Sequence, residues 1–432
     1  MPTQPQPVSR STRIACLVVA LLSVGALVYP PLPLLTLLAD SEQYRESGAA
    51  LLSGEVLRAN SDHRNTQHIA VALRPPLFPL FLGITSRLPF LAPDTALITA
   101  HIVLGALLLM TAPLLLRRSV PPLLTTLATG FALYAVKQVA WGVMSEWLAM
   151  WLLLLAAVLY LSWVSRASPR LALAVSVCVS LAILTRTALL PWLGLLLVMV
   201  PQAPQGARRV TATALGAGLL PLLLWGAINL YRTGTFSIFP YEGLNLVATA
   251  RSLGTIPTAP NDSEIQRRVI SEINERGVTA PDSAFTPSTV HQWNGEFYEA
   301  FHNNFNVTTD TVHALENPSL ARPSTLAARG LRAHEERYHL FLWGGARTLT
   351  IDYLPLILVC AMATAWLARK APEARRWGLG VLTLCVLSLT YLAVIFGTML
   401  WLHRYVIPVQ PIILFCLMVS TGRLLIPIAQ RR

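Results

Sequence analysis

The chain has 432 residues, of which 54% are hydrophobic and 12% are charged, whereas an ordinary soluble domain carries about 25% charged residues. This composition excludes disordered, collagen-like and disulfide-scaffold proteins, and apolar runs along the whole chain exclude a protein with a single membrane anchor. The 33 basic and 21 acidic residues give a net charge of +12. Arg and Lys collect in the short cytoplasmic loops of polytopic membrane proteins, where they meet membrane lipids, so we expect no nucleic-acid partner. The sequence therefore predicts an all-α polytopic membrane protein.

The first predicted span follows a basic cytoplasmic N-terminus, residues 1–13. Arg10 and Arg13 precede an apolar run from Ile14 to Leu38, which is too long for the hydrophobic region of a signal peptide. Later apolar segments have the length of about 20 residues that crosses a bilayer as a helix. They are expected to span at residues 95–116, 120–140, 147–164, 210–231, 346–368, 377–397 and 405–427.

The apolar segment from Leu171 to Val200 is interrupted by Arg186 and has two interpretations. It is either one long tilted helix with Arg186 at mid-membrane, or a hairpin of two short spans. The hairpin gives about ten spans in total. It places the loop arginines on the side of the N-terminus, as the positive-inside rule requires. Among the acidic residues, only Glu373 then lies in a cytoplasmic loop. The basic residues concerned are Arg117, Arg118, Arg166, Arg170, Arg208, Arg209, Arg369, Lys370, Arg375, Arg376, Arg431 and Arg432. We therefore expect the hairpin.

Two segments are then predicted to lie outside the membrane. Residues 14–231 form an N-terminal transmembrane module whose first periplasmic loop, residues 40–90, ends in a short apolar piece after Arg74-Pro75-Pro76. This piece predicts an amphipathic juxtamembrane helix in the outer leaflet, with the prolines fixing its start. The large periplasmic loop, residues 232–345, has helix-like patches at 262–277 and 334–343 and is expected to fold as a small cap. Residues 346–432 supply the C-terminal transmembrane helices and a short cytoplasmic tail.

Ionisable and aromatic residues gather at the outer ends of the predicted spans. They are Asp40, Glu42 and Tyr44 after the first span, then Arg74, Glu146 and Arg186, and finally His403, Arg404 and Tyr405 before the last span. Carboxylates and arginines at a membrane boundary suit an enzyme that acts on a lipid-linked anionic substrate. A carboxylate takes a proton from a nucleophile, and Arg neutralises phosphate through charge-assisted hydrogen bonds.

Each of these residues also has a structural interpretation. Asp40 could end a span, the arginines could reach lipid headgroups, the tyrosines fit the aromatic belt, and Glu146 could pair with Lys137. His334 and His339 are five residues apart, so they do not share a helical face as the histidines of a zinc helix do. The sequence has no GxGxxG, Walker, GxSxG or DxD run, so it supports neither a nucleotide-binding fold nor a serine hydrolase. An activated donor outside the cytoplasm would most simply arrive attached to a membrane lipid.

The order of these motifs resembles that of the GT-C glycosyltransferases, multi-span enzymes that include the lipid A aminoarabinose transferase and the protein O-mannosyltransferases. The motifs that carry the resemblance are Asp40-Ser41-Glu42-Gln43-Tyr44 with Ala49, Leu52 and Gly54, then Arg74-Pro75-Pro76-Leu77-Phe78-Pro79-Leu80, Ser145-Glu146, Leu184-Thr185-Arg186, Asn229 with Gly234 and Phe236, and Arg404-Tyr405 with Pro408 and Pro411. The resemblance implies a polyprenyl-phosphate sugar donor, a catalytic Asp in the first outer loop, inversion at the anomeric carbon, and an acceptor from the periplasmic side.

The resemblance also implies roles for single residues. Asp40 resembles the general base, and Glu42 is the second acid of a pair that is adjacent in the family but split here by Ser41. The implied ligands of the donor phosphate are Arg74, Arg186 and Arg404, and the implied substrate-binding residues are Tyr44, Glu146, His403 and Tyr405. A carboxylate pair can hold Mg²⁺ or Mn²⁺ with water ligands, so a divalent metal remains open. Larger relatives carry a C-terminal soluble domain that is not expected after the last span here, so acceptor recognition is expected from the two outer loops.

We therefore expect an inverting glycosyltransferase of the bacterial inner membrane, active on its periplasmic face. Its partners would be a lipid-linked sugar donor and a glycolipid, a protein such as a pilin, or a polysaccharide as acceptor. One alternative is an O-antigen polymerase or ligase, whose essential Arg and His would lie in the large loop, here Arg337 and His334. The other is a transporter or flippase for lipid-linked sugars, which needs charged residues along a path inside the spans; apart from Lys137, Asp352 and Arg186, the predicted spans are nearly free of charge.

Overall fold

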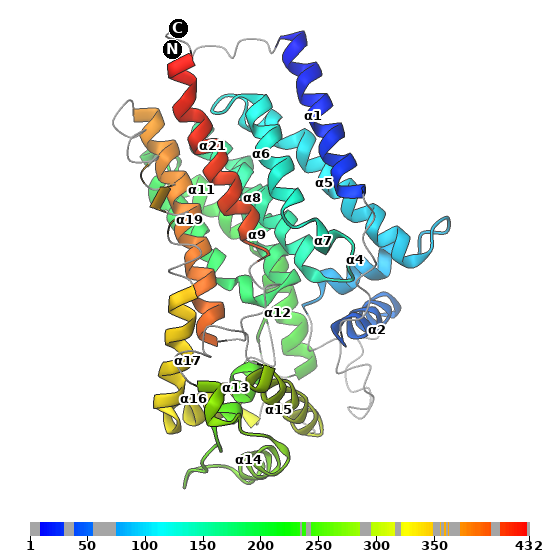
Figure 1. The fold of residues 1–432 in the computed structure, drawn as a ribbon, viewed down its shortest axis with the longest axis vertical. Helices are drawn as coiled ribbons and strands as arrows, with labels where there is room; N and C mark the ends of the chain where they lie inside the picture. Colours follow the sequence, from blue (N-terminus) through cyan, green and yellow to red (C-terminus); the bar gives the residue numbers. More distant parts are fainter. Residues whose placement is uncertain are drawn as a thin grey trace.

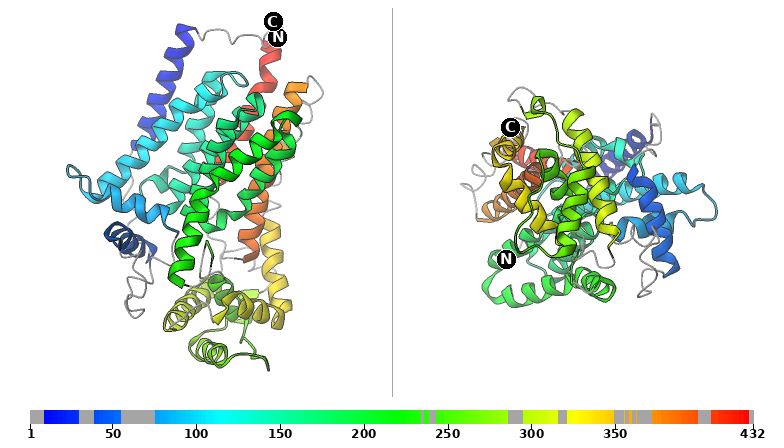
Figure 2. Two further views of the ribbon diagram at one scale, coloured as in Figure 1. Left: turned by 180° about the vertical axis from the view of Figure 1, so that it is seen from behind. Right: turned by 90° about the horizontal axis from the view of Figure 1, so that it is seen from below.

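The computed structural model is all helical in the residues that it describes, which are 9–29, 39–54, 75–233, 236–238, 243–285, 295–315, 321–348, 355, 358–359, 362, 372–398 and 407–429. A long helical bundle carries a smaller group of helices at one end (Figures 1 and 2). The bundle contains α1 (Arg10–Val28), α2 (Ala39–Ser53), α4 (Leu77–Thr85), α5 (Pro93–Leu116), α6 (Pro122–Tyr134), α7 (Lys137–Ala140), α8 (Ser145–Arg166), α9 (Pro169–Thr185), η2 (Thr187–Trp192), α10 (Leu193–Gln202), η3 (Gln205–Ala207), α11 (Arg208–Gly218), α12 (Leu220–Thr233), α19 (Pro372–Thr398) and α21 (Gln410–Ala429). The smaller group, called the cap below, contains α13 (Leu244–Leu253), α14 (Glu264–Arg276), η4 (Asp282–Phe285), α15 (Gly295–His313), α16 (Pro323–Ala333) and α17 (Glu335–Thr348).

Four helices in the described part are long and apolar enough to cross a membrane. They are Arg10–Val28, Pro93–Leu116, Ser145–Arg166 and Arg375–Ile395, and α11 with α12 makes a fifth if the bent pair is counted as one span. The predicted all-helical class is confirmed, and these helices are compatible with a membrane protein. Ten spans are not shown: four further apolar helices have only 10–17 residues within the described part, namely Pro122–Tyr134, Pro169–Thr185, Thr187–Gln202 and Gln410–Thr421. The predicted span at 346–368 lies mostly outside the described residues.

The first helix ends earlier than its apolar run predicts. α1 stops at Val28, and Tyr29 is already extended. Pro30 and Pro31 follow in the sequence, and a proline disfavours helical backbone in the residue before it and cannot donate a helical hydrogen bond. The prediction of one span to Leu38, with Asp40 just beyond its end, is therefore wrong: Asp40 belongs to the separate helix α2.

The chain reverses at Arg186, as the hairpin interpretation predicts. Arg186 lies against Glu146 in the first turn of α8, with 2.5 Å between its Nη1 and the carboxylate. By Gln202 the chain has returned to the other end of α8, where the Tyr160 hydroxyl donates to the Gln202 side chain at 2.7 Å. Helix α9 therefore runs one way along α8, and η2 with α10 runs back.

Among the residues that the structure describes, the arginines predicted to share one side lie at one end of the bundle. The guanidinium of Arg166 donates to the Leu115 carbonyl at 2.8 Å, which joins the last turns of α8 and α5. The beginning of α19 packs against the same part of α8, where a Cβ on Gly380 would lie 3.3 Å from Val164. We call this end the arginine-rich end, and its residues are Arg117, Arg118, Arg166, Arg170, Arg208, Arg209, Arg375 and Arg376. Helix α1 begins and α21 finishes there, and the cap lies at the opposite end (Figure 1).

Helices α11 and α12 meet at a bend of 41° near Leu219. Pro221 causes the break, because it has no N–H to continue the helical ladder. Two hydroxyls of α9 bind carbonyls next to the bend: Ser176 donates to Leu215 at 2.6 Å and Ser180 donates to Gly218 at 2.8 Å. The bend directs α12 toward the cap (Figure 1).

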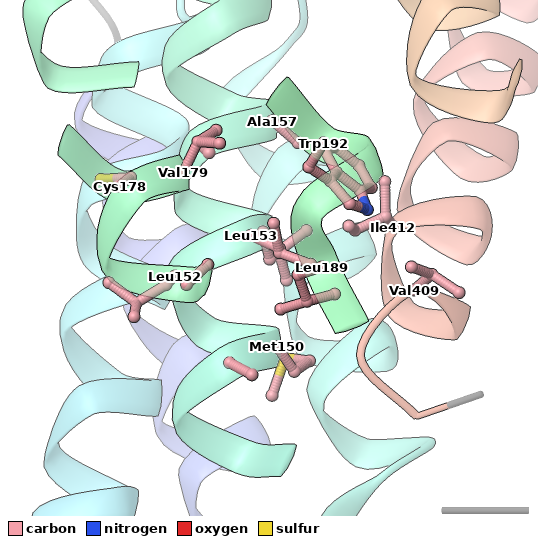
Figure 3. Close-up of a cluster of buried hydrophobic side chains, with 14 of the residues drawn as sticks. Met150, Leu152, Leu153, Ala157, Cys178, Val179, Leu189, Trp192, Val409 and Ile412 are labelled. Carbon is pink, nitrogen blue, oxygen red and sulfur yellow. The ribbon is translucent and has the colours of Figure 1, made fainter. Parts of the chain in front are cut away.

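The core of the bundle is built around α8. Its side chains are buried over most of its length, including the fully buried Trp147. Figure 3 shows Leu153 of α8 in one buried cluster with Leu189 and Trp192 of η2, and Ile412 of α21 lies beside Trp192. Segments distant in the sequence therefore pack on one central helix, and α8 fixes the position of α9 and η2.

The cap has its own hydrophobic clusters, separate from that of the bundle. One gathers residues of α13, α14, α15 and α16, and the other is aromatic and contains Phe285, Phe297 and Phe341. Helix α14 begins with a reciprocal capping box, in which the Ser263 hydroxyl accepts from the Gln266 N–H and the Gln266 side chain accepts from the Ser263 N–H. The predictions of helices near 262–277 and 334–343 are confirmed by α14 and α17.

Two arginines hold the cap helices together. Arg251 is buried and donates to the carbonyls of Ile273, Asn274 and Gly277, which tie α13 to the end of α14. Arg329 of α16 binds both carboxylate oxygens of Asp262, at 2.5 and 2.7 Å. This bidentate geometry is the strong form of an arginine–carboxylate contact.

Candidate functional site

The structure describes three of the predicted site residues completely, namely Tyr44, Glu146 and Arg186. For Asp40 and Glu42 it describes the helical backbone of α2, and their side chains lie outside the described part. Four further predicted residues, Arg74, His403, Arg404 and Tyr405, lie outside the described residues altogether. The three complete residues come together at one place, although α2, α8 and α9 are far apart in the sequence.

Helix α2 is fastened to the bundle by polar contacts on two sides. The Ser41 hydroxyl donates to the Val143 carbonyl at 3.3 Å, just before α8. Arg45 forms an ion pair of 2.6 Å with Asp94 in the first turn of α5. These contacts hold the first turns of α2 beside the beginning of α8.

The middle of α2 is fastened by a close backbone approach to α4. A Cβ on Gly48 would lie 2.5 Å from the Pro79 carbonyl oxygen, and a Cβ on Gly83 would lie 3.0 Å from the Gly48 carbonyl oxygen. Only glycine allows two helices to approach so closely. Helix α4 begins directly after Pro75 and Pro76, as predicted from the sequence. Helix α4, which the sequence predicted as an amphipathic juxtamembrane helix, therefore packs directly against α2.

Tyr44 connects α2 to the beginning of α8. Its hydroxyl donates to the Ser145 hydroxyl at 3.1 Å. Its ring meets Phe78 of α4 edge to face, with 4.9 Å between the ring centroids. Tyr44 is buried, so its position is fixed by ring packing and by the hydrogen bond rather than by an interfacial aromatic belt.

Arg186 joins the same place from the tip of the α9–α10 hairpin. Its guanidinium forms an ion pair with Glu146 and donates to the Ser145 hydroxyl at 3.2 Å. The side chains of Arg186 and Glu146 are only 11% and 4% exposed, which makes this a buried pair rather than a surface one. Glu146 also lies in the first turn of α8, where the helix dipole stabilises a negative charge. We call Tyr44, Ser145, Glu146 and Arg186 the three-helix junction.

The predicted structural alternative for Glu146 is wrong. Lys137 instead donates to the backbone carbonyls of Ala26 and Tyr29 at 3.0 and 3.1 Å and lies over the ring of Tyr134. It therefore holds the end of α1, and Glu146 pairs with Arg186.

Ser145 belongs to the Ser145-Glu146 motif, but the sequence predicts no role for its side chain. The structure makes its hydroxyl the common partner of Tyr44 and Arg186. A serine before a buried acid carries no distinctive signal in a sequence, so only the three-dimensional contacts reveal this role.

The register of α2 relates the junction to the predicted acids. Asp40 precedes Tyr44 by four residues on the same helix, and residues four apart share a helical face. Glu42 is two residues from Tyr44, a spacing that does not share a face. Asp40 and Tyr44 therefore occupy positions on one face of α2, and Glu42 occupies a position on another face.

The arrangement suits the handling of polar or anionic groups at a dry site. It combines two hydroxyls that donate and accept, one carboxylate and one guanidinium, all in a low-dielectric setting where charge-assisted hydrogen bonds are strong. Among the residues that the structure describes, no three His, Cys, Asp or Glu side chains are grouped to hold a metal ion.

The candidate residues of the alternative enzyme class lie inside the cap framework. Arg337 donates to the Leu253 carbonyl at 2.6 Å, pairs with Asp282 and covers the ring of Phe285. The ring of His334 lies 2.8 Å from the Thr255 carbonyl. Both residues therefore join cap segments to one another.

No protein-family model matches the sequence, and no curated protein is significantly similar to it.

Proposed function

We propose that the protein is an inverting membrane glycosyltransferase of the GT-C type and that the three-helix junction is part of its active site. The donor is a sugar on a polyprenyl phosphate, and the acceptor is a hydroxyl group of a glycolipid, a protein or a polysaccharide. In this proposal the chain spans the bacterial inner membrane about ten times, with the arginine-rich end in the cytoplasm and the cap in the periplasm.

One observation supports the proposal most directly. The hydrogen bonds of Ser145 to Tyr44 and Arg186 unite three segments that the resemblance singles out, namely those around residues 40–44, 145–146 and 184–186. Each motif alone is a weak sign of the family, but their contact in three dimensions supports a shared site. Asp40, the proposed base, occupies a position on the same face of α2 as Tyr44.

The reaction is a direct displacement at the anomeric carbon. The acceptor oxygen forms a bond to this carbon, and its proton passes to the carboxylate of Asp40. The bond from the anomeric carbon to the phosphate oxygen breaks, and its electron pair leaves with the polyprenyl phosphate. Arg186 stabilises the negative charge that develops on this phosphate, together with Arg74 and Arg404. Positive charge acts most strongly where negative charge accumulates, so it lowers the barrier rather than only improving binding.

The contacts of the cap favour this proposal over a polymerase or ligase centred in the large loop. Arg337 and His334 contact neighbouring backbone and side chains of the cap, whereas the motifs that the resemblance singles out meet at the three-helix junction. For the transporter alternative, Arg186 lies at the end of α9 and not within that helix.

The deciding experiment compares Asp40→Asn with Glu46→Gln. Glu46 lies on the exposed side of the same helix, so its substitution controls for the change of charge on α2. Membranes with equal amounts of each variant are tested for transfer of labelled sugar from a polyprenyl phosphate, and the masses of glycolipids and glycoproteins are compared in a deletion strain. We expect Asp40→Asn to lower transfer by about 10²- to 10⁴-fold and Glu46→Gln to retain it.

Three outcomes would contradict the proposal or part of it. Near-normal transfer by Asp40→Asn would remove Asp40 from the chemistry. Loss of product with His334→Ala and Arg337→Ala, at normal protein levels and with Asp40→Asn active, would favour the polymerase or ligase. Movement of lipid-linked sugar without a covalent product would favour the transporter. A parallel assay with a chelator tests the dependence on Mg²⁺ or Mn²⁺.

A further inference from the structure

Four arginines meet at the arginine-rich end of the bundle, where α5 and α8 finish. Arg117 and Arg118 are exposed and follow α5 directly, Arg166 is the last residue of α8, and Arg170 lies in the first turn of α9. The hydroxyls of Ser119 and Ser165 are 2.6 Å apart. This hydrogen bond joins the loop after α5 to the end of α8. Arg170 follows Arg166 by four residues along the chain, so we treat the four arginines as one cluster.

The cluster has no negative partner in the described part of the chain. None of its four arginines forms an ion pair there. Arg117 and Arg118 lie close enough to Arg166 for their positive charges to repel it. One nitrogen of Arg166 donates to the Leu115 carbonyl, while its Nε is buried without a hydrogen-bond partner among the described residues. Like charges held together in this way attract an anion.

Two helix N-termini add positive potential at the same place. Helix α6 begins at Pro122, four residues after Arg118, and α9 begins at Pro169, three residues after Arg166. Neither helix has a side-chain cap, so first-turn N–H groups are available to an anion. A helix N-terminus combines such donors with the positive end of the helix dipole.

An apolar stripe leads to the cluster along α5. Val103, Leu107, Met110 and Leu114 are exposed, and their spacing of four, three and four residues places them on one face of the helix. The stripe ends one turn before Arg117. A headgroup at the cluster would therefore have its acyl chain beside an apolar helix face, which a free phosphate ion would not use.

We propose that this cluster binds the phosphate of an anionic phospholipid in the leaflet at the arginine-rich end. The phosphate oxygens accept from the guanidinium groups of Arg117, Arg118 and Arg166, and one acyl chain lies along the exposed stripe of α5. The site is at the opposite end of the bundle from the three-helix junction and does not depend on the proposed sugar transfer.

The test is a lipid titration of the purified full-length chain, followed by native mass spectrometry. The probes are dioleoyl phosphatidylglycerol and, as the neutral comparison, dioleoyl phosphatidylcholine. The test variant is Arg117→Gln/Arg118→Gln. The matched control is Arg375→Gln/Arg376→Gln, which removes an adjacent, exposed arginine pair at the same end of the bundle. None of these four side chains has a described contact whose loss would unfold the protein.

We expect the test variant to lose affinity for phosphatidylglycerol by about tenfold or more, because hydrogen bonds to charged groups are strong. The control variant should change by less than about threefold, within the range of an exposed charge contact, and phosphatidylcholine binding should not change. Equal losses of phosphatidylglycerol affinity in both variants would show that lipid binding depends on the total positive charge of this end, and would overturn the proposed site. Displacement of phosphatidylglycerol by millimolar inorganic phosphate would overturn the lipid assignment, because a free ion would then satisfy the cluster.

Discussion

Arg186 and Glu146 form a buried ion pair, in which 2.5 Å separates the guanidinium from the carboxylate. The pair connects the tip of the α9–α10 hairpin to the first turn of α8. It thereby fixes the position of both charges beside the hydroxyls of Tyr44 and Ser145. Breaking the pair should affect the fold as well as any chemistry, and the two effects can be separated.

Arg186→Met should lower the thermal stability of the purified protein strongly. Glu146 would remain buried without its partner, a loss of about 3–5 kcal/mol for a pair of this kind. The double variant Arg186→Met/Glu146→Leu should recover most of that loss, because no charge stays buried. Arg45→Met serves as the control. Its pair with Asp94 is more than one-third exposed on both sides, so the expected loss is about 0–1 kcal/mol. A double variant as unstable as the single one would contradict the electrostatic coupling.

Tyr44→Phe should remove the bond to Ser145 and keep the ring contact with Phe78. The expected loss of stability is about 0.5–1.5 kcal/mol, the net value of one hydrogen bond. Ser145→Ala should cost more than Tyr44→Phe, because the Ser145 hydroxyl also accepts from Arg186. Unfolding of the two single variants and the double variant gives a coupling energy. Strictly additive effects would show that the two hydroxyls do not interact.

Gly48→Ala should displace α2 from α4. The new Cβ would lie 2.5 Å from the Pro79 carbonyl oxygen, and backbone at this position cannot move aside cheaply. Crowding of this kind costs about 1–3 kcal/mol, and sugar transfer should fall because α2 carries the proposed base. The control is Gly216→Ala on α11, where a Cβ meets nothing within 4 Å and alanine should be neutral or slightly stabilising. Melting temperature and transfer rate, measured on both variants, test this relation. Equal behaviour of the two would contradict the close approach.

The cap should lose stability as the pH falls below the ordinary range of an aspartate. Hydrogen bonding to Arg329 lowers the pKa of Asp262 below its usual value of 3.8. A lowered pKa in the folded state means that the ionised form stabilises folding. This contribution is complete above pH 3.8 and disappears as the pH falls through the lower pKa of the folded cap. The protection factors of amides in α13 and α16, which correct hydrogen exchange for its intrinsic pH dependence, should therefore fall on acidification.

Asp262→Asn provides the comparison for this pH effect. Its cap should exchange faster than wild type at neutral pH, because Arg329 would have lost its charged partner. Its exchange should also lose the part of the acid dependence that Asp262 contributes. An unchanged acid dependence in Asp262→Asn would show that other groups control the stability of the cap.

The sequence predicts the helical class and the path of the chain better than it predicts the contacts. Charge asymmetry is a property of whole loops, so it identifies the reversal at Arg186 without any knowledge of packing. The start of α4 follows from Pro75 and Pro76, which constrain the backbone locally. Prolines also constrain the backbone just after Val28, and they account for the end of α1 there. The apolar composition up to Leu38 instead predicts a longer helix.

Contacts between distant residues were beyond a single sequence. Lys137 and Glu146 are close along the chain and opposite in charge, yet the break after α6 directs Lys137 to the carbonyls at the end of α1. The hydroxyl of Ser145 becomes important only because Tyr44 and Arg186 reach it from other helices. The buried Arg251 is bound mainly by backbone carbonyls, which have no sequence signature.

All four residues of the three-helix junction occur within the first 186 positions of the 432-residue chain. During synthesis they have therefore left the ribosome before the first helix of the cap is translated. Since chains fold from the N-terminus as they emerge, the pairing of Arg186 with Glu146 becomes possible while the C-terminal half is still unmade. The order of translation thus gives the junction a chance to assemble before any cap segment can compete for its charges.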